Sequence, residues 1–306
     1  MTTAHTPRQI NQGLWLGLLG IVIFSVTLPM TRMAVGTPEL PQMSGFFIAM
    51  GRAVVAAALS IVFLLLSRAP LPRQADWLPL AITAAGVVFG FPLFTSIAMR
   101  YVEAMHASVI IGVLPLATAA VGALLHRQRP SPGFWLCAAL GSALVVAFAL
   151  SHGGTSTHQA AAGISVHLAD GLLLAAMLCA AVGYGYGGRL SHHMRAEHVI
   201  CWALVLALPL TLPMAAYSWP RETLTPNAWW GFAYLAVFSM WIGFFAWYRG
   251  LAMGGTVRVS QVQLVQPFLS MLFAVPLLGE HLDAVTVGFG VAVIATVFIG
   301  KKMPVR

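Results

Sequence analysis

Charged side chains are scarce in this sequence. Asp, Glu, Lys and Arg together make up 8% of its 306 residues, whereas hydrophobic residues make up 59%. Soluble globular domains carry about 25% charged residues, so this scarcity excludes an ordinary water-soluble protein. The chain instead contains a succession of apolar segments, and a helix of about 20 such residues spans a bilayer core. The composition therefore predicts an all-α polytopic membrane protein.

The few acidic residues avoid the middle of the apolar segments. The eight acids are Glu39, Asp76, Glu103, Asp170, Glu197, Glu222, Glu280 and Asp283. Each falls in a connection or at the end of an apolar segment. Proton relays and sodium sites commonly use a carboxylate buried in the membrane. The sequence therefore predicts that no carboxylate switch lies deep in the bilayer.

Cysteine is also rare. Cys137, Cys179 and Cys201 lie in or at the edge of three different apolar segments, without C-x-x-C spacing. This pattern fits neither a disulfide framework nor a zinc site, and it favours simple packing roles. We expect no metal and no cofactor.

Ten apolar segments lie between clusters of turn or charged residues. They cover residues 14–34, 45–66, 77–99, 104–125, 132–150, 171–188, 199–218, 229–249, 257–277 and 282–300. No small-residue cleavage site follows a short apolar core near the N-terminus, so we expect the first segment to be a retained helix instead of a signal peptide. The sequence thus predicts ten transmembrane helices.

The basic residues predict the orientation. With the N-terminus in the cytoplasm, 12 of the 16 fall on the cytoplasmic side: Arg8, Arg68, Arg73, Arg127, Arg129, Arg189, Arg195, Arg249, Arg258, Lys301, Lys302 and Arg306. Arg32, Arg100 and Arg221 fall outside, and Arg52 lies within a span. The positive-inside rule then predicts that both termini lie in the cytoplasm, with the chain in the inner (plasma) membrane. Basic residues scattered in this way form no patch for nucleic acid.

The chain divides into two halves. The longest polar connection, 151–170, separates five segments from five, which predicts units at 14–150 and 171–300. A constant shift of 152 residues pairs Ser108 with Ser260 and Pro115 with Pro267. Because five is odd, the second unit must cross the membrane in the opposite sense. Inverted repeats of this kind provide two related arrangements open to opposite sides.

Glycine pairs at helical spacing favour close helix packing. They are Gly13/Gly17, Gly86/Gly90, Gly183/Gly187 and Gly250/Gly254. Prolines inside the spans, among them Pro29, free carbonyl groups that neighbouring groups must satisfy. Ordinary membrane-helix composition is the alternative explanation for both features.

Several short motifs resemble those of the EamA-type drug/metabolite transporter superfamily. They are the Arg-led stretch 51–57 (GRAVVAA), the junction 98–115 with its proline, the stretch 248–252 (YRGLA), and Leu278-Gly279-Glu280. The first unit departs from the pattern with His126-Arg127-Gln128 where Gly-Glu is usual, and Arg258 replaces a small residue. The resemblance implies ten helices in an inverted pair. It also implies export or exchange of small metabolites, amino acids or drugs.

Two groups of polar residues are candidates for substrate binding. Arg52 lies within the second span, where it could anchor a substrate carboxylate or bond to backbone carbonyls and reach toward the surface. Ser260, Gln263 and Gln266 precede Pro267 in the ninth span, where amides could bind polar groups or simply join helices. Pro115 and Pro267 are the candidate hinges.

Aromatic and titratable residues complete the candidate site. Tyr184 and Trp241 are candidates for the cavity wall, although aromatics near span ends are often interfacial anchors. His106 could titrate near neutral pH, or be an ordinary helix-end histidine. Glu280 is a gate or a structural hydrogen-bonding group, by the resemblance. We expect facilitated or weakly proton-linked movement of substrate, with no dependence on sodium.

Three functions compete at this stage. The first is a secondary transporter that lies in a lipid bilayer and binds a small-molecule substrate. Neutral or zwitterionic amphiphiles suit a cavity wall that contains one arginine. The second is an intramembrane enzyme, which the absence of a deep acid or nucleophile–base pair disfavours. The third is a scaffold or receptor, which a solid interior without a cavity would favour. The sequence fixes no oligomeric state.

Overall fold

The computed structural model describes residues 7–125, 131–152, 166–281 and 284–301. Within these ranges the chain is helical, with one isolated backbone bridge between Gly36 and Pro41 and no strand. The motif at 126–128 and Asp283 lie outside the described residues. So do the side chain of Arg258 and most of the connection 151–170.

The first half of the chain contains the following elements. They are α1 (Pro7–Ser25), α2 (Thr27–Val35), α3 (Gly45–Leu66), η1 (Gln74–Asp76), α4 (Trp77–Thr83), η2 (Ala84–Gly90), α5 (Phe91–Ala98), α6 (Ala104–Ile111), α7 (Leu114–Leu125) and α8 (Pro132–His152). The second half contains α9 (Val166–Leu190), α10 (Ala196–Tyr217), α11 (Pro226–Tyr234), η4 (Leu235–Ile242), α12 (Gly243–Gly254), α13 (Thr256–Val259), η5 (Ser260–Val265), α14 (Gln266–Leu278) and α15 (Ala284–Lys301).

Seven helices among the described residues are long and apolar enough to cross a membrane. They are Arg8–Val35, Gly45–Leu66, Gln74–Ala98, Ala104–Leu125, Leu168–Leu190, Ala196–Tyr217 and Pro226–Gly254. The remaining predicted spans coincide with α8, with α13 to α14, and with α15. The all-α class is therefore established, and the count of ten stays a prediction.

Two helix starts differ from the predicted spans. The first helix begins at Pro7 instead of residue 14, and α9 begins at Val166 instead of residue 171. Both helix starts contain polar residues, so hydropathy alone did not assign these turns to the spans. The second difference moves Asp170 from a connection into a helix.

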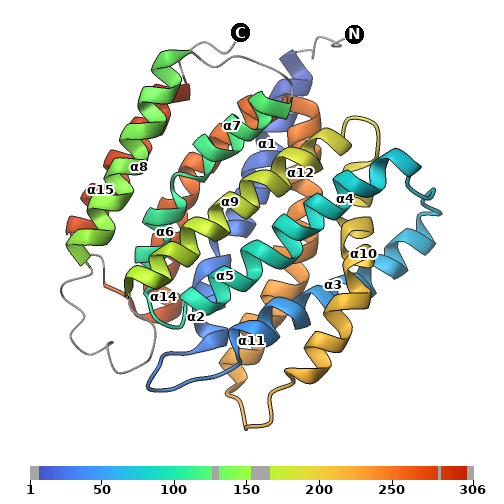
Figure 1. The fold of residues 1–306 in the computed structure, drawn as a ribbon, viewed down its shortest axis with the longest axis horizontal. Coiled ribbons are helices and arrows are strands. Elements are labelled where there is room, and N and C mark those ends of the chain that lie inside the picture. Colours follow the sequence, from blue (N-terminus) through green and yellow to red (C-terminus); the bar gives the residue numbers. More distant parts are fainter. Residues whose placement is uncertain (1–6, 126–130, 153–165, 282–283, 302–306) are drawn as a thin grey trace.

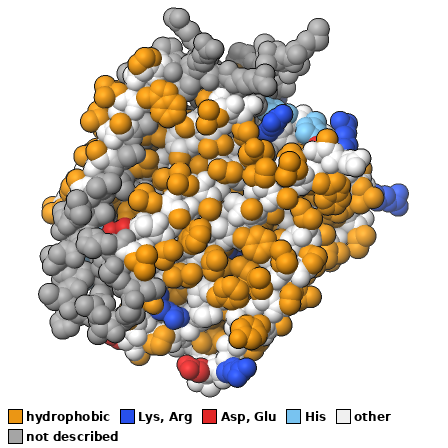
Figure 2. Space-filling view, in the orientation of Figure 1, with side chains coloured by type: hydrophobic (Ala, Val, Ile, Leu, Met, Phe, Trp, Pro, Cys, Tyr) orange, Lys and Arg blue, Asp and Glu red, His pale blue; other side chains and the backbone are white. Residues whose placement is uncertain are grey.

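The long helices run obliquely past one another, and exposed apolar side chains cover most of the face that Figure 2 shows. In Figure 1 the start of α1 and the end of α15 lie at the upper end of the molecule. The ends of α2 and α14 lie at the lower end. Broad exposed apolar surface is what a protein surrounded by lipid tails needs.

Helices from the two halves pack together throughout the molecule. Helix α1 contacts α12, and α9 contacts the segment from α4 to α5. Helix α3 contacts α10, α6 contacts α14, and α8 contacts α15 (Figure 1). Neither half therefore forms a bundle separate from the other.

Glycine sets the closest of these approaches. A methyl group built on Gly13 would lie 2.6 Å from Gly254 N, and one on Gly250 would lie 2.8 Å from Gly17 N. On the other side of the molecule, one on Gly183 would meet the backbone and side chain of Val87. The predicted close packing at these glycines is confirmed. Backbones approach in this way only where the side chain is absent.

We expect Gly250→Ala to lower stability by about 1–3 kcal/mol, because the added methyl group must push α1 and α12 apart. Gly171→Ala is the control, since no atom lies within 4 Å of its added methyl group. Alanine should there be neutral or stabilising, because it favours the helix more than glycine does. Thermal unfolding of the purified proteins in detergent measures both, and an equal effect of the two substitutions would contradict the packing argument.

Candidate functional site

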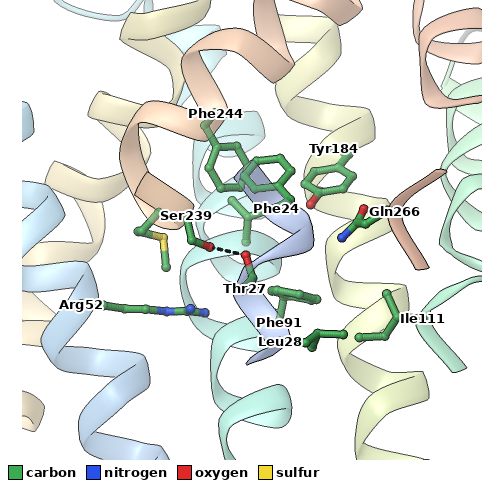
Figure 3. Close-up of a pocket in the computed structure, with 12 residues that line it drawn as sticks. Phe24, Thr27, Leu28, Arg52, Phe91, Ile111, Tyr184, Ser239, Phe244 and Gln266 are labelled. Carbon is green, nitrogen blue, oxygen red and sulfur yellow. Dashed lines mark hydrogen bonds between the residues drawn. The ribbon is translucent and has the colours of Figure 1, made fainter. Parts of the chain in front are cut away.

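A small cavity of about 20 Å³, with room for about one water molecule, lies where α1, α2, α3, η2, α5, α6, α9, η4, α12 and α14 meet. Its wall is made by Phe24, Thr27, Leu28, Arg52, Val87, Phe91, Ile111, Tyr184, Ser239, Met240, Phe244 and Gln266 (Figure 3). Residues from both halves of the chain contribute to this wall. It combines aliphatic, aromatic, hydroxyl and amide groups with a single arginine.

A break between α1 and α2 shapes one side of the cavity. Pro29 has no N–H to donate to the carbonyl of Ser25 four residues earlier, so the helix is interrupted there. Ser270 Oγ of α14 donates a hydrogen bond to that carbonyl at 2.8 Å. Tyr234 Oη donates to the carbonyl of Ile23 at 2.9 Å. Side chains of the second half therefore satisfy the backbone groups that the break exposes, as expected for prolines in membrane helices.

Two π-helical segments face this break. Segment η2 provides Val87, and η4 provides Ser239 and Met240. Ser239 Oγ and Thr27 Oγ1 are hydrogen-bonded at 2.9 Å across the two halves (Figure 3). Single π-helical turns widen a helix locally and are frequent at functional sites. Here they occur in the third and the eighth of the predicted spans, which are equivalent positions of the two units.

An aromatic group forms another part of the wall. The ring centroids of Phe24 and Phe244 lie 5.1 Å apart, and Tyr184 lies 6.4 Å from the first and 6.0 Å from the second. Trp247 supports the group from behind, 5.4 Å from Tyr184. Such offset and edge-on contacts hold aromatic rings in fixed positions. Tyr184 was a candidate from the sequence, and the two phenylalanines were not.

Arg52 reaches the cavity from α3. Its side chain is 1% exposed and points toward the centre of the cavity in Figure 3. Nε and Nη1 have no hydrogen-bond partner among the described residues. Neither alternative structural role, bonding to carbonyls or reaching to the surface, is present in this arrangement.

The ninth predicted span changes its winding beside the cavity. It is a 3₁₀-helix over Ser260–Val265 and becomes α-helical at Gln266, with Pro267 in its first turn. Gln266 lines the main cavity and also a smaller neighbouring one of about 10 Å³. Gln263, which is 1% exposed, faces this smaller cavity, and both of its amide atoms lack a partner among the described residues.

The two candidate hinges occupy equivalent places. Pro115 is the second residue of α7, which follows the interruption of the fourth span after Ile111. Pro267 is the second residue of α14. Proline is tolerated in the first turn of a helix because its missing N–H would be unpaired there anyway. Both prolines also line the smaller cavity, together with Ser108 and Ser270.

Two other candidates do not reach the main cavity. Trp241 packs against Phe63 and Phe245, with ring centroids 6.1 and 5.0 Å away. Ser260 is fully buried in η5 but lines neither cavity. The cavity is lined instead by Thr27 and Ser239, each of which is a single hydroxyl side chain within an apolar run. Only the nearby Pro29 gave a sequence signal for the break that brings them together.

Glu280 joins the two halves where α14 ends and α6 begins. Its carboxylate accepts hydrogen bonds from the backbone N–H groups of Ala104 and Met105 at 2.7 and 2.9 Å, which caps the start of α6. Burial raises the pKa of Glu280, while these two bonds act in the opposite direction. Gly279 makes the turn possible, because its φ of 69° is strained for other residues. Glu280 is thus a helix cap outside the cavity.

Two arginines reinforce the same end. Arg32 Nη1 donates to the carbonyl of Met99 at 2.6 Å. Arg100 Nη2 donates to the carbonyls of Val35 and Met43 at 3.2 and 2.6 Å. These bonds tie the loops at the ends of α2 and α5 together.

Asp170 lies near the start of its span, Leu168–Leu190, as the sequence predicts, yet it is buried. This residue is 5% exposed within α9, and its Oδ1 lies 2.6 Å from His106 Nε2 of α6. A buried carboxylate is tolerated where a partner satisfies it, and the partner comes from the other half of the chain. His106, which is partly buried, therefore belongs to a pair between the two halves that the sequence alone did not reveal.

At the opposite end of the molecule, one contact joins the two halves and two lie within the second half. His193 Nε2 lies 2.9 Å from Asp76 Oδ1. Tyr248 Oη donates to the carbonyl of Gly183 at 3.2 Å, and Arg249 pairs with Glu197 at 3.1 Å. Side-chain contacts therefore close the helix bundle both above and below the cavity.

Comparison with known proteins places this architecture. The EamA-like transporter family matches residues 11–150 and, a second time, residues 167–300. The chain belongs to the EamA-like transporter family. The resemblance drawn from its short motifs is confirmed.

The chain is similar in sequence to the uncharacterized transporter YdeK of Bacillus subtilis (strain 168). The two sequences are 40% identical over 294 residues, which cover 94% of this chain and 96% of that protein. One solved crystal structure has the same fold, with a TM-score of 0.66 at 16% identity over 95% of this chain and 98% of that one. Family and relative together identify this EamA-like protein as a multi-pass membrane transporter.

We expect Ser270→Ala to lower stability by about 1–3 kcal/mol, because the carbonyl of Ser25 would lose its hydrogen bond in an apolar environment. Ser191→Ala is the matched control. Ser191 Oγ bonds to the carbonyl of Gly187, which also accepts a backbone N–H. Thermal unfolding in detergent should show the larger loss for Ser270→Ala, and equal losses would contradict the role given to this bond.

Proposed function

We propose that this EamA-like protein is a secondary transporter of small amphiphilic metabolites such as amino acids or drugs. In this proposal the substrate occupies the cavity, and two inverted five-helix units alternate between arrangements open to opposite sides. The observation that carries the proposal is the cavity itself, which is built from both halves of the chain. In the arrangement that the structure shows, the cavity is smaller than any substrate, so the proposal requires the helices to move apart before a substrate enters.

The packing of the helices supports the inverted pair. The five spans of each half can be numbered in order. The contact between α1 and α12 then joins the first span of the first half to the third span of the second half. The contact between α9 and the α4–α5 segment joins the first span of the second half to the third span of the first half. Exchanging the halves turns one of these contacts into the other and leaves the pairs α3 with α10, α6 with α14 and α8 with α15 unchanged. The two π-helical segments and the two prolines at helix starts also exchange. Such a relation is what alternating access requires.

The chemistry of the wall supports the substrate class. Aromatic and aliphatic groups suit an apolar body, and Thr27, Ser239 and Gln266 offer hydrogen bonds. Sugar phosphates call for several cationic groups, and this wall has only Arg52. Hydrogen bonds at both ends of the bundle would have to break in turn for the cavity to open.

The His106–Asp170 pair is the proposed coupling site, because it joins a histidine to a buried carboxylate and is shared by both halves. The proposed orientation has both termini in the cytoplasm, which the common end of α1 and α15 in Figure 1 supports. Export as the direction follows from the family alone.

Transport is tested with purified protein in liposomes, using radiolabelled amino acids and cationic drugs in counterflow. We expect flux of at least one class, and we expect Gln263→Ala to reduce it, because an amide facing the substrate path would be lost. Gln74→Ala changes an exposed amide at the start of η1 and serves as control. Unchanged flux in Gln263→Ala would remove the ninth span from the site, and strict dependence on a sodium gradient would contradict the proposed coupling.

Orientation is tested with reporter tags at the two termini in intact cells. We expect both tags to report the cytoplasm, because the basic residues and an even number of spans require it. Tags that report opposite compartments would contradict the inverted pair.

A further inference from the structure

The proposed transport function leaves open which charge the substrate carries, and the cavity wall addresses this question. None of the twelve residues that line the cavity is acidic, and Arg52 is the one basic residue among them. Its guanidinium has no hydrogen bond to any residue that the structure describes, and its Nε and Nη1 are fully buried. The other charge-related neighbour is Tyr184, a neutral phenol at physiological pH.

Two partly buried arginines of this chain behave differently. Arg32 and Arg100 both donate to backbone carbonyls at the lower end of the bundle. The fold thus provides carbonyl partners for arginines where they have a structural role. Arg52 has none within the described residues, although it is the most deeply buried of the three.

A buried guanidinium keeps its charge at neutral pH and is costly to hold without a counter-charge. The free-energy cost of burying this charge is offset only if an anion binds to Arg52 during the transport cycle. Arginine suits a carboxylate best, because its planar donors match the two carboxylate oxygens.

The rest of the wall determines what the carboxylate is attached to. Phe24, Phe244 and Tyr184 lie across the cavity from Arg52 in Figure 3, with Thr27 and Ser239 between them. A flat apolar group would pack against these rings. An ammonium group would find hydroxyl and amide oxygens there but no carboxylate.

We propose that the cavity selects aromatic monocarboxylates, with the carboxylate on Arg52 and the ring against Phe24, Phe244 and Tyr184. This inference rests on the proposed function, and it narrows the substrate class from amphiphiles in general to organic monoanions. Zwitterions follow in affinity, neutral analogues bind more weakly, and cations are excluded.

The test uses four compounds that share one ring and one carbon chain. They are 3-phenylpropionate, L-phenylalanine, 3-phenylpropanamide and 3-phenylpropylamine, which carry an anion, a zwitterion, no charge and a cation. Binding to purified full-length protein in nanodiscs of zwitterionic lipid is measured by calorimetry. A charge-assisted hydrogen bond predicts that 3-phenylpropionate binds about tenfold to a hundredfold more tightly than the amide. The amine should not compete.

Variants of the arginine locate the effect. Arg52→Gln should reduce the affinity for 3-phenylpropionate to that of the amide and leave the amide unaffected. Arg52→Lys should retain part of the preference, because it keeps the charge but loses the planar donors. Arg221→Gln removes the same charge from an exposed loop and should change nothing. The comparison of the four compounds on the unmodified protein needs no variant, so it decides the question even if Arg52→Gln fails to fold.

Equal affinity for the anion and the amide, or an anion preference that survives Arg52→Gln, would overturn the inference. Counterflow in liposomes separates it from the proposed function. Flux without a preference for anions would leave transport in place and reject anion selection. Anion binding that depends on Arg52 but gives no flux would reject transport and retain the anion site.

Discussion

A polar group inside a bilayer has no water to bond to, so each one must find a partner within the protein. This constraint governs the places where the helices of this transporter are interrupted. The carbonyl of Ser25, freed by Pro29, bonds to Ser270, and the open start of α6 bonds to Glu280. Because the partner comes each time from the other half, the same bonds that satisfy the backbone also join the two units.

Two buried groups without such a partner in the described part of the chain line the two cavities. Arg52 and Gln263 are as deeply buried as the groups around them, yet neither has a hydrogen bond among the described residues. They line two neighbouring cavities beside the interrupted helices. An unsatisfied polar group is expensive in a static core, and it becomes useful where a substrate with matching groups enters and leaves. In the proposed function, the interrupted helices and the unpaired side chains both contribute to the substrate site.

The sequence determined the class and much of the layout. Scarce charge and recurrent apolar runs require membrane helices, and glycines at helical spacing allow α1 to approach α12 closely. Pro29, Pro115 and Pro267 predicted interruptions that the structure contains, because proline removes a donor wherever it stands. The importance of Arg52 also follows from sequence, since a charge in an apolar run is costly in any fold.

Only the tertiary structure decided which residues meet. Asp170 lies just before an apolar run, and nothing local reveals that α9 starts earlier and brings it to His106, 64 residues away. Thr27 and Ser239 lie 212 residues apart and become neighbours only when the halves pack together. Trp241, which is deep in its segment, faces Phe63 and Phe245 instead of the cavity. Hydropathy and local motifs specify how deep a residue lies, whereas the direction of its side chain depends on helix rotation and on contacts across the two halves.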